Sequence, residues 1–366
     1  MGFVVPIFCE DVVPGDVFRH RIDALIRAQA LLAPVMHTVD IDIHAWFCPD
    51  RLIWDNATKF QSGGDDGLDT SVYPTTSSGG SGYTESSLAD YLGYPTGILN
   101  QTASVLPFRA YGLIWNENYR DSQIQAKVTV STADGLDTTT NKSLLAPCWK
   151  RDYFTQCRPQ PQLGPEVTIP LGSTAPVVTD GNAPTMAASG GAARAFQHTN
   201  GSNSILLSAG ATVTGSAKFV ASGLQADLSS ATGIDVRDLR EGSALQRILE
   251  HNNIFGGRYI EQVWSRFKTR VPDYRLDRPE FLGSGASNFQ FSEVLQTAEG
   301  ADPALGVGSM YGHGIALVGS NRYKYRVPEH GWIMVFLVVR PKTQYMQGLP
   351  RKFSRTSRYD FLILGS

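Results

Sequence analysis

The sequence predicts a mainly β protein, a β-sandwich or jelly roll with long insertion loops and a few short helices. The chain has 36 glycines and 20 prolines among 366 residues, which favours turns and short strands over helical bundles. Strand-like segments lie near both ends, with helices and long loops between them. Strands that pair across a whole sequence are typical of sandwiches and jelly rolls rather than of βαβ units.

The first clear element is a strand at residues 38–47, TVDIDIHAWF, in which apolar side chains occupy every second position. These side chains are expected to share one buried face, since alternate residues of a strand point to opposite sides of a sheet. Asp40, Asp42 and His44 lie on the other face, which we expect to be solvated or to form an interface. Pro49 then marks the start of a short helix.

A long loop and two short helices follow. Residues 61–86 are loop by composition, being rich in glycine, serine, threonine and aspartate. SSLADYLGYP, residues 86–95, predicts a short capped helix that ends at Gly93. LPFRAYGLIWNENYRD, residues 106–121, predicts a helix that begins near Pro107.

Residues 172–234 differ in composition from the rest of the chain. They hold four charged residues and are otherwise dominated by glycine, alanine, serine, threonine and valine. So little charge is unlike a disordered, solvated tail, whereas small β-tolerant residues favour an elaborated loop with short strands. We interpret 172–234 as a low-charge insertion whose strands pair with copies of themselves.

The C-terminal half returns to ordinary patterns. Asp235 is a candidate N-cap for a helix over residues 235–253, and RYIEQVWSRF, residues 258–267, predicts another helix. In NRYKYRV, residues 321–327, tyrosines alternate with basic residues, so this strand is expected to have a basic face. WIMVFLVV, residues 332–339, is a continuous apolar run that predicts a central strand buried on both faces.

The sequence lacks the motifs of common enzymes. It contains no G-x-S-x-G nucleophile elbow, no Walker A loop and no G-x-G-x-x-G after a strand. The cysteines have no zinc-site spacing and are expected to be reduced and structural; they are Cys9, Cys48, Cys148 and Cys157.

Two groups of side chains are candidates for a reactive site. Asp40, Asp42 and His44, with Glu329 and His330 as a second set, could bind a metal, but a solvated or interface strand face is favoured. The second group is Glu117 and Asp121, a possible carboxylate pair for glycosidic chemistry. The favoured interpretation is that these carboxylates cap the helix and pair with Arg109 and Arg120 along it. We therefore expect no catalytic, cofactor or metal site.

No segment resembles a membrane anchor or a secretion signal. The longest apolar runs fall far short of 18 residues, and the N-terminus has no basic region before an apolar core. We expect no membrane partner and a chain that is made and kept in a cytoplasm until assembly.

Basic residues concentrate near the C-terminus although the formal net charge of the chain is −2. Between Arg340 and Arg358 there are six cations and no acid, interleaved with aromatic residues. Cations bind phosphates and aromatic rings stack on bases, but arginine and aromatic residues also dominate subunit interfaces. The candidates for nucleic-acid or inter-subunit contact are Arg322, Lys324, Arg326, Arg351, Lys352, Arg355, Arg358, Phe353 and Tyr359.

Motifs along two-thirds of the chain resemble the major capsid proteins of the Microviridae, and the gokushovirus type in particular. In order, they are VVPGDVFRHR, WFCPDRLIWDN, SLADYLGYP, LPFRAYGLIWNENYRD, CWKRDYFTQCRPQPQLGPEVTIPL, RYIEQVWSRF, PDYRLDRPEFLGSG, EHGWIMVFLVVR and YMQGLPRKFSRTSRYDF. Family members usually continue beyond SRYDF with a tail that contacts neighbouring subunits, and whether this chain has such a tail is left open.

The resemblance implies a structural protein without an active site. It implies one eight-stranded antiparallel jelly roll over residues 1–366, sixty copies in a small icosahedral (T=1) shell, and single-stranded DNA bound without sequence preference. It gives 172–234 the role of a protrusion at the threefold axes. Small basic DNA-binding proteins and minor capsid proteins are further candidate partners, and a divalent ion at a symmetry axis is left open. The expected location is the virion, after assembly in the cytoplasm of a bacterial host.

Two other classes of protein share the jelly-roll fold. A secreted, lectin-like jelly roll would need a secretion route, and a jelly-roll enzyme would need a metal or carboxylate site. The sequence supports neither feature, so a capsid protein is the favoured interpretation.

Overall fold

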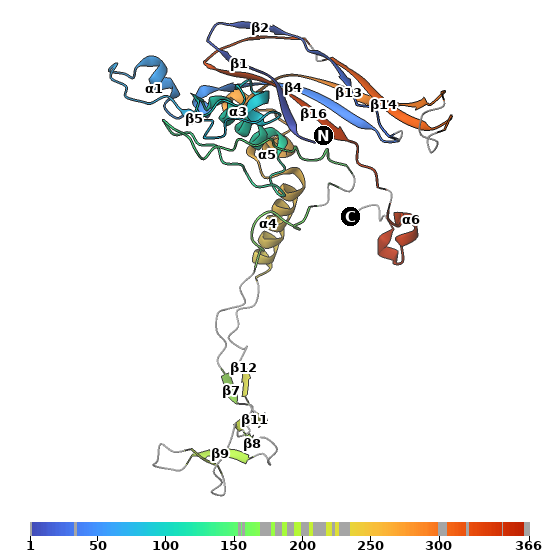
Figure 1. Ribbon diagram of the computed structural model, residues 1–366. Coiled ribbons are helices and arrows are strands. Elements are labelled where there is room, and N and C mark those ends of the chain that lie inside the picture. The colour runs from blue at the N-terminus through green and yellow to red at the C-terminus, as the bar shows by residue number, and fades with distance from the viewer. Residues whose placement is uncertain are drawn as a thin grey trace. The chain divides into compact units, whose positions relative to one another are not determined.

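The structure of the protein is a computed structural model (Figure 1). It describes residues 2–32, 35–152, 155, 158–168, 235–298, 306–319, 322–345 and 347–361, together with six short strands between residues 177 and 226. The chain divides into two compact units, one made of residues 1–157 with 259–366 and the other of residues 158–258. Among the described residues, no helix is long and apolar enough to cross a lipid bilayer.

The first unit is built on a six-stranded antiparallel sheet, which curves as Figure 1 shows. Its strands lie in the order β1-β16-β4-β13-β14-β3. The bounds are β1 (Val4–Val12), β3 (Asp23–Arg27), β4 (Val39–Pro49), β13 (Glu280–Leu295), β14 (Met310–Gly319) and β16 (Gly331–Pro341). This part of the chain is mainly β, as the sequence predicts, and strands from its two ends are neighbours.

Strands β4 and β16 form the centre of the sheet. They pair without interruption from Gly331 opposite Pro49 to Pro341 opposite Val39. The central strand predicted from WIMVFLVV is confirmed, because this run has no polar side chain to turn toward water. The half-buried strand predicted at 38–47 is a strand, but its half-burial is wrong, since both faces of β4 are covered.

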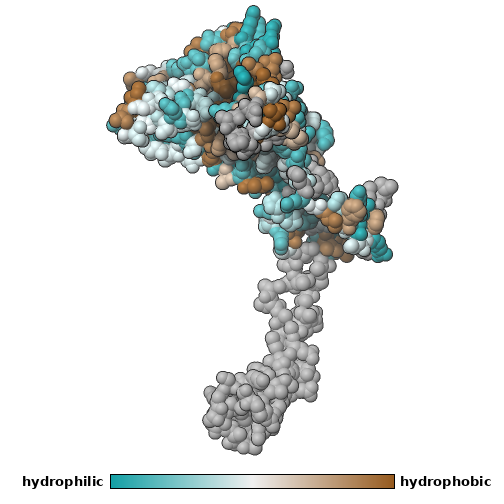
Figure 2. Space-filling view, turned by 45° about the vertical axis from the view of Figure 1, so that its right-hand side comes forward, coloured by the Kyte–Doolittle hydropathy of each residue, from teal (hydrophilic) through white to brown (hydrophobic). Residues whose placement is uncertain are grey.

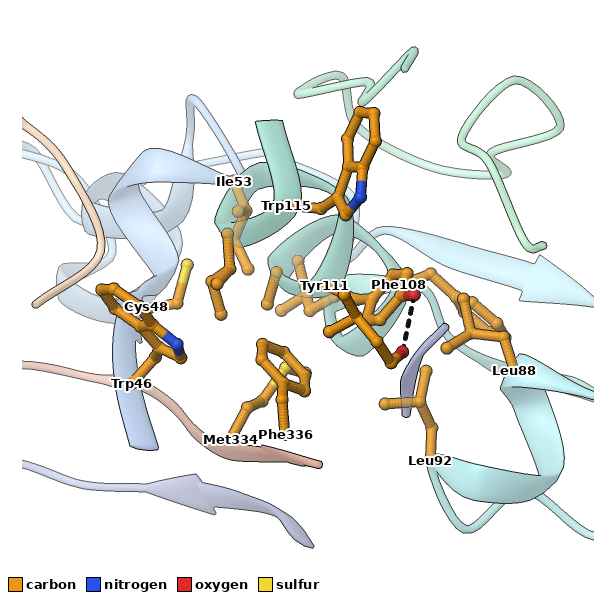
Figure 3. Close-up of a cluster of buried hydrophobic side chains, with 14 of the residues drawn as sticks. Trp46, Cys48, Ile53, Leu88, Leu92, Phe108, Tyr111, Trp115, Met334 and Phe336 are labelled. Atoms are coloured by element: carbon orange, nitrogen blue, oxygen red, sulfur yellow. Dashed lines mark hydrogen bonds between the residues drawn. The ribbon is translucent and has the colours of Figure 1, made fainter. Parts of the chain in front are cut away.

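The two faces of the sheet pack against different partners. On one face the strands form a core from their own side chains: Val39, Ile41, Ile43, Ala45, Phe289, Ala316, Val318 and Val335. On the other face, Trp46, Met334 and Phe336 pack with residues of helix α3 (Leu106–Ile114), in the cluster that Figure 3 shows. The helix predicted in 106–121 is therefore confirmed, and it covers the sheet.

Helix α3 is buried at eight of its nine residues. A Cβ at Gly112 would lie 2.7 Å from a methyl carbon of Val130, so the following loop approaches the helix closely only because this residue is glycine. Tyr111 donates a hydrogen bond to the carbonyl of Val4 (2.9 Å) and accepts one from the amide of Leu145 (2.9 Å). The helix thereby joins strand β1 to the loop.

Arg109 of α3 forms an ion pair with Asp137, and neither side chain is more than 1% exposed. The guanidinium also donates hydrogen bonds to the carbonyls of Ile53 (3.1 Å) and Ala133 (2.8 Å). Asp137 accepts from the amide and the hydroxyl of Thr140. Burial alone would raise the pKa of Asp137, but these hydrogen bonds outweigh it and hold the pKa well below its ordinary value.

Shorter elements complete the first unit. Two ribbons pair β2 (Val17–His20) with β15 (Tyr323–Arg326) and β5 (Thr75–Ser77) with β6 (Thr102–Ser104). The helices are α1 (Ala57–Ser62), α2 (Leu88–Tyr91), α5 (Tyr259–Phe267) and α6 (Arg351–Ser354). Ser87 caps α2 by accepting from the amide of Asp90, and the left-handed Gly93 follows its end, so the predicted capped helix is confirmed.

The second unit contains helix α4 (Val236–Phe255) and short strands. Asp235 caps α4 by accepting from the amide of Arg237 (3.2 Å), as the sequence predicts. Short strands predicted in 172–234 are present, and they are β7 (Val177–Thr179), β8 (Thr185–Ala188), β9 (Arg194–His198), β10 (Ile205–Leu207), β11 (Ala217–Ala221) and β12 (Leu224–Ala226). The rest of 172–234 lies outside the described residues.

Strands β13 and β14 were not predicted from the sequence. Glycines interrupt both strands and weaken their local strand preference. In the structure, aromatic rings occupy the space of the missing side chains. A Cβ at Gly314 would lie 2.1 Å from the ring of Phe289, and one at Gly283 would lie 3.1 Å from the ring of Tyr323. Gly283 and Gly314 are therefore needed because the rings of distant residues pack where a side chain would lie.

We predict that Asp137→Asn destabilises the unassembled subunit by about 3–5 kcal/mol, because it leaves the Arg109 guanidinium buried beside a neutral partner. The measurement is the free energy of unfolding in urea. The matched control is Asp23→Asn, which breaks the surface pair between Arg21 and Asp23 and should cost at most about 1 kcal/mol. Equal losses in the two variants would contradict the role assigned to the buried pair.

Candidate nucleic-acid and subunit interfaces

The ribbon of β2 and β15 has the basic face that the sequence predicts. Lys324 and Arg326 are exposed, as is Arg322 just before the strand. The residues that alternate with these cations, Tyr323 and Tyr325, are half-buried. The burial pattern thus confirms the expected alternation. The three predicted cations of this strand lie on one surface.

The inner face of the ribbon is anchored in the core, which sets the direction of the basic face. Tyr325 donates a hydrogen bond to Glu280 (3.1 Å), and the Tyr323 hydroxyl forms one with His20 (3.1 Å). Burial raises the pKa of Tyr323 to about 12 and lowers the pKa of His20, so both groups favour their neutral forms at pH 7. Because alternate strand residues point in opposite directions, Lys324 faces outward.

The outward face of the ribbon brings like charges together. Lys324 lies directly opposite Arg19 in the strand register. Like charges in this position destabilise a strand pair, so an anion bound between them would be stabilising. Arg21 adjoins them and is paired with Asp23 (2.8 Å). A pocket of about 500 Å³ is lined by Arg19, His20, Arg21, Arg322, Tyr323 and Lys324.

Sequence reasoning missed Arg19 and Arg21. The signal that could have found them is the stretch FRHR, residues 18–21, which begins in β2 and alternates in the same way as RYKYR, residues 322–326, around β15. Nothing local indicates that the two stretches pair, because about 300 residues separate them.

The C-terminal candidates lie in segment 347–361, around α6. Lys352, Phe353, Arg355 and Arg358 are exposed, and the side chains of Arg351 and Tyr359 lie outside the described residues. The Lys352 ammonium lies 4.8 Å from the centre of the Phe353 ring, and the Arg355 guanidinium lies 5.3 Å from that of Phe361. One face of each ring is therefore covered by a cation of the same segment.

Arg340 does not belong with these exposed cations. Its guanidinium donates to Asp42 (2.8 Å) and to the carbonyl of Cys148 (2.8 Å), and its side chain is 14% exposed. Lys150 bridges Asp42 (2.9 Å) and Asp40 (3.1 Å). Burial alone would raise the pKa of Asp42, but hydrogen bonds from Arg340 and Lys150 lower it overall.

Asp40 and Asp42 of this strand face therefore belong to an ion-pair network with Arg340 and Lys150. His44 of the same strand forms a hydrogen bond with the hydroxyl of Tyr119 (2.9 Å), and the Tyr119 oxygen accepts one from Trp46 (3.1 Å). Burial lowers the pKa of His44, which favours the neutral ring. Among the described residues, no three His, Cys, Asp or Glu side chains are grouped so that they could hold a metal.

The remaining candidate pairings also change in the structure. Glu329 pairs with Arg51 (2.9 Å) rather than with a metal-binding set. Glu117 lies 3.7 Å from Arg278. Of the two arginines predicted to pair with Glu117 and Asp121, Arg109 does not serve this purpose. Arg109 instead reaches Asp137 in a loop that sequence patterns could not place against α3.

Comparisons with known proteins agree with the resemblance read from the motifs. A family model described as "Capsid protein (F protein)" matches residues 1–363. The capsid protein VP1 of Bdellovibrio phage phiMH2K is 34% identical over 379 residues, which cover 98% of this chain and 69% of the relative. The VP1 proteins of Chlamydia phage 1 and Spiroplasma virus 4 are 28% and 27% identical, over 99% and 97% of this chain and 72% and 69% of the relatives.

We predict that Arg340→Met destabilises the unassembled subunit by about 3–5 kcal/mol, because the Asp42 carboxylate loses its best-buried partner. Lys150→Met serves as the matched control and should cost at most about 1 kcal/mol, since Lys150 is 51% exposed. Urea unfolding of both variants measures the difference. If the lysine variant is the less stable of the two, the network is ordered differently from the structure.

Proposed function

Since this chain belongs to the capsid protein (F protein) family, we propose that sixty copies of it form a small icosahedral (T=1) shell around a single-stranded DNA genome. The chain is a capsid protein and not an enzyme, because the family and its relatives are structural capsid proteins. The secreted carbohydrate-binding alternative finds no support among these relatives. The shell is a component of the virion, assembled in the cytoplasm of a bacterial host.

The fold that we propose for the shell subunit is an eight-stranded jelly roll. The six strands of the curved sheet, β1, β16, β4, β13, β14 and β3, together with β2 and β15 of the ribbon beside it, would supply the eight strands. Two observations support this assignment: β1 is paired with β16 from the other end of the chain, and β2 is paired with β15 in the same way. Long connections that return to the first strand are typical of Greek-key folds.

The observation that carries the DNA contact is the pairing of Lys324 with Arg19 on the exposed face of the ribbon. A chain of net charge −2 has no general need for opposed cations at its surface. Phosphates between these side chains would offset their repulsion, and Arg322 and Arg326 would extend the contact along the backbone. Such binding is independent of sequence, weakens with salt, and repeats in every subunit of the shell.

Segment 347–361 is assigned to contacts between subunits. Phe353 and Phe361 are 62% and 55% exposed, and each is stacked with a cation from its own segment. Exposed aromatic rings beside arginine are typical anchors of protein–protein interfaces, where their burial stabilises the complex. Arg351 and Tyr359 belong to this proposal by their place in the segment.

Residues 172–234 are proposed to form protrusions at the threefold axes of the shell. Their low charge suits packing against two other copies rather than exposure to water. The neighbouring helix α4 supports this, because three apolar residues of its predicted stripe are about half exposed in the single chain: Leu239, Leu245 and Ile248. Association of three stripes would remove this surface from water.

We predict that Arg19→Gln combined with Lys324→Gln leaves shells that assemble but hold less DNA or release it at lower salt. The logarithm of the DNA-binding constant falls linearly with the logarithm of the salt concentration, and losing two phosphate contacts per subunit should make this slope shallower by roughly one to two. The measurements are the ratio of absorbance at 260 and 280 nm of purified particles and DNA retention across a salt series. Lys59→Gln, at an exposed lysine of α1, is the matched control.

The possible outcomes distinguish between DNA and a neighbouring subunit as the partner of the ribbon. Normal shells with normal DNA content would rule out the ribbon as the DNA contact. Folded subunits that no longer form shells would assign the ribbon to a neighbouring subunit instead.

Deletion of residues 175–230 is expected to leave shells that assemble without projections at their threefold axes. The reason is that both predicted elements of the shell wall, the sheet and α3, lie outside the deleted range. Electron microscopy of the purified particles measures the outline. An unchanged outline would show that the insertion does not form the protrusions.

A further inference from the structure

Helix α5 has its apolar side outward. On a helical wheel, Tyr259, Val263, Phe267, Ile260 and Trp264 span one continuous side, while Ser265 lies opposite them. The structure buries Ser265 and leaves Ile260 and Val263 half-buried, while the three aromatic residues are exposed, with Tyr259 at 67%, Trp264 at 46% and Phe267 at 72%. A surface helix of a monomer normally buries its apolar side, so this orientation predicts a partner.

The end of α5 and the residues that follow it are also basic. Residues 264–275 contain three arginines and one lysine against a single aspartate. The Arg270 guanidinium lies 5.2 Å from the centre of the Trp264 ring. Tryptophan, tyrosine and arginine are the residues most enriched among the anchors of protein–protein interfaces, and here they occur side by side. The partner should therefore present both apolar surface and negative charge.

The chain itself carries such a surface in the loop of residues 63–72. Asp65 and Asp66 are exposed, and Leu68 is 76% exposed beside them. The loop is held in shape by its own hydrogen bonds, from the amide of Leu68 to Asp66 (3.1 Å) and from the amide of Asp69 to the carbonyl of Gly63 (3.1 Å). The loop therefore presents acidic side chains around an exposed leucine. This arrangement is complementary to the basic residues around the exposed aromatic rings of α5.

We infer that α5 of one copy, with the basic residues after it, docks on the 63–72 loop of a neighbouring copy. This inference rests on the proposed function, since it requires that copies of the chain assemble. The contact joins two different surfaces, so it is heterologous, and contacts of this kind close into rings when the rotation between copies allows it. Figure 2 shows hydrophobic and hydrophilic residues intermixed on the visible surface of the chain, as such mixed contacts require.

A charge swap tests the contact. Arg270→Glu and Asp65→Arg are each expected to lower the yield of assembled particles by about tenfold or more, because each places like charges across the interface. The double variant Arg270→Glu/Asp65→Arg restores opposite charges and should recover most of the yield. Particle yield is measured by sedimentation, and urea unfolding shows that each variant subunit is folded. Arg27→Glu, at an exposed arginine of β3, is the control for charge reversal alone.

The result that would overturn the inference is wild-type assembly in both single variants, or a double variant no better than the worse single one. The wild-type chain separates this inference from the proposed function. Wild-type oligomers that never reach shell size but respond to the swap would support the docking contact and contradict the proposed shell. A wild-type chain that stays monomeric at every concentration would contradict both.

Discussion

The pairing of β16 with β4 is the constraint on which the rest of the first unit depends. It joins residues almost 300 positions apart and places an unbroken apolar strand at the centre of the sheet. A strand buried on both faces needs a cover on each side, and the strands β13 and β14 supply one while α3 supplies the other. The pairing of β1 with β16 then brings the segments beyond them together, which is why β2 meets β15.

Because both faces of the sheet are covered, charged side chains at these positions need hydrogen-bond and ion-pair partners inside the protein. Arg109 and Asp42 are charged groups at buried positions, and each is tied to an opposite charge and to further hydrogen bonds. A buried charge without such partners would cost several kcal/mol, so these networks hold loops in one arrangement. Arg109 fixes the loop that carries Asp137, and Asp42 fixes the segment that carries Lys150. The conformation of these two surface segments is thus fixed by buried ion pairs.

The surface that remains is unusual for an isolated chain and suitable for a capsid subunit. It combines opposed cations on the ribbon, stacked cations and rings at 347–361, and an outward apolar side on α5. The opposed cations and the outward apolar side do not stabilise a monomer in water. Each becomes favourable when phosphates, acids or apolar surfaces of other molecules cover it, and a shell repeats a gain of about 1 kcal/mol in every subunit.

The sequence by itself determined the family, the central strand, the capped helices and the alternation of β15, because ordered motifs and hydrophobic periodicity are local properties. It could not separate cations by role. Arg340 and Lys324 look alike in the sequence, yet Arg340 is paired with Asp42, 298 positions away, and Lys324 is exposed opposite Arg19. The glycine-rich strands β13 and β14 and the outward orientation of α5 were likewise decided only by tertiary structure. In each case the deciding partner comes from a distant part of the chain, and no local pattern records it.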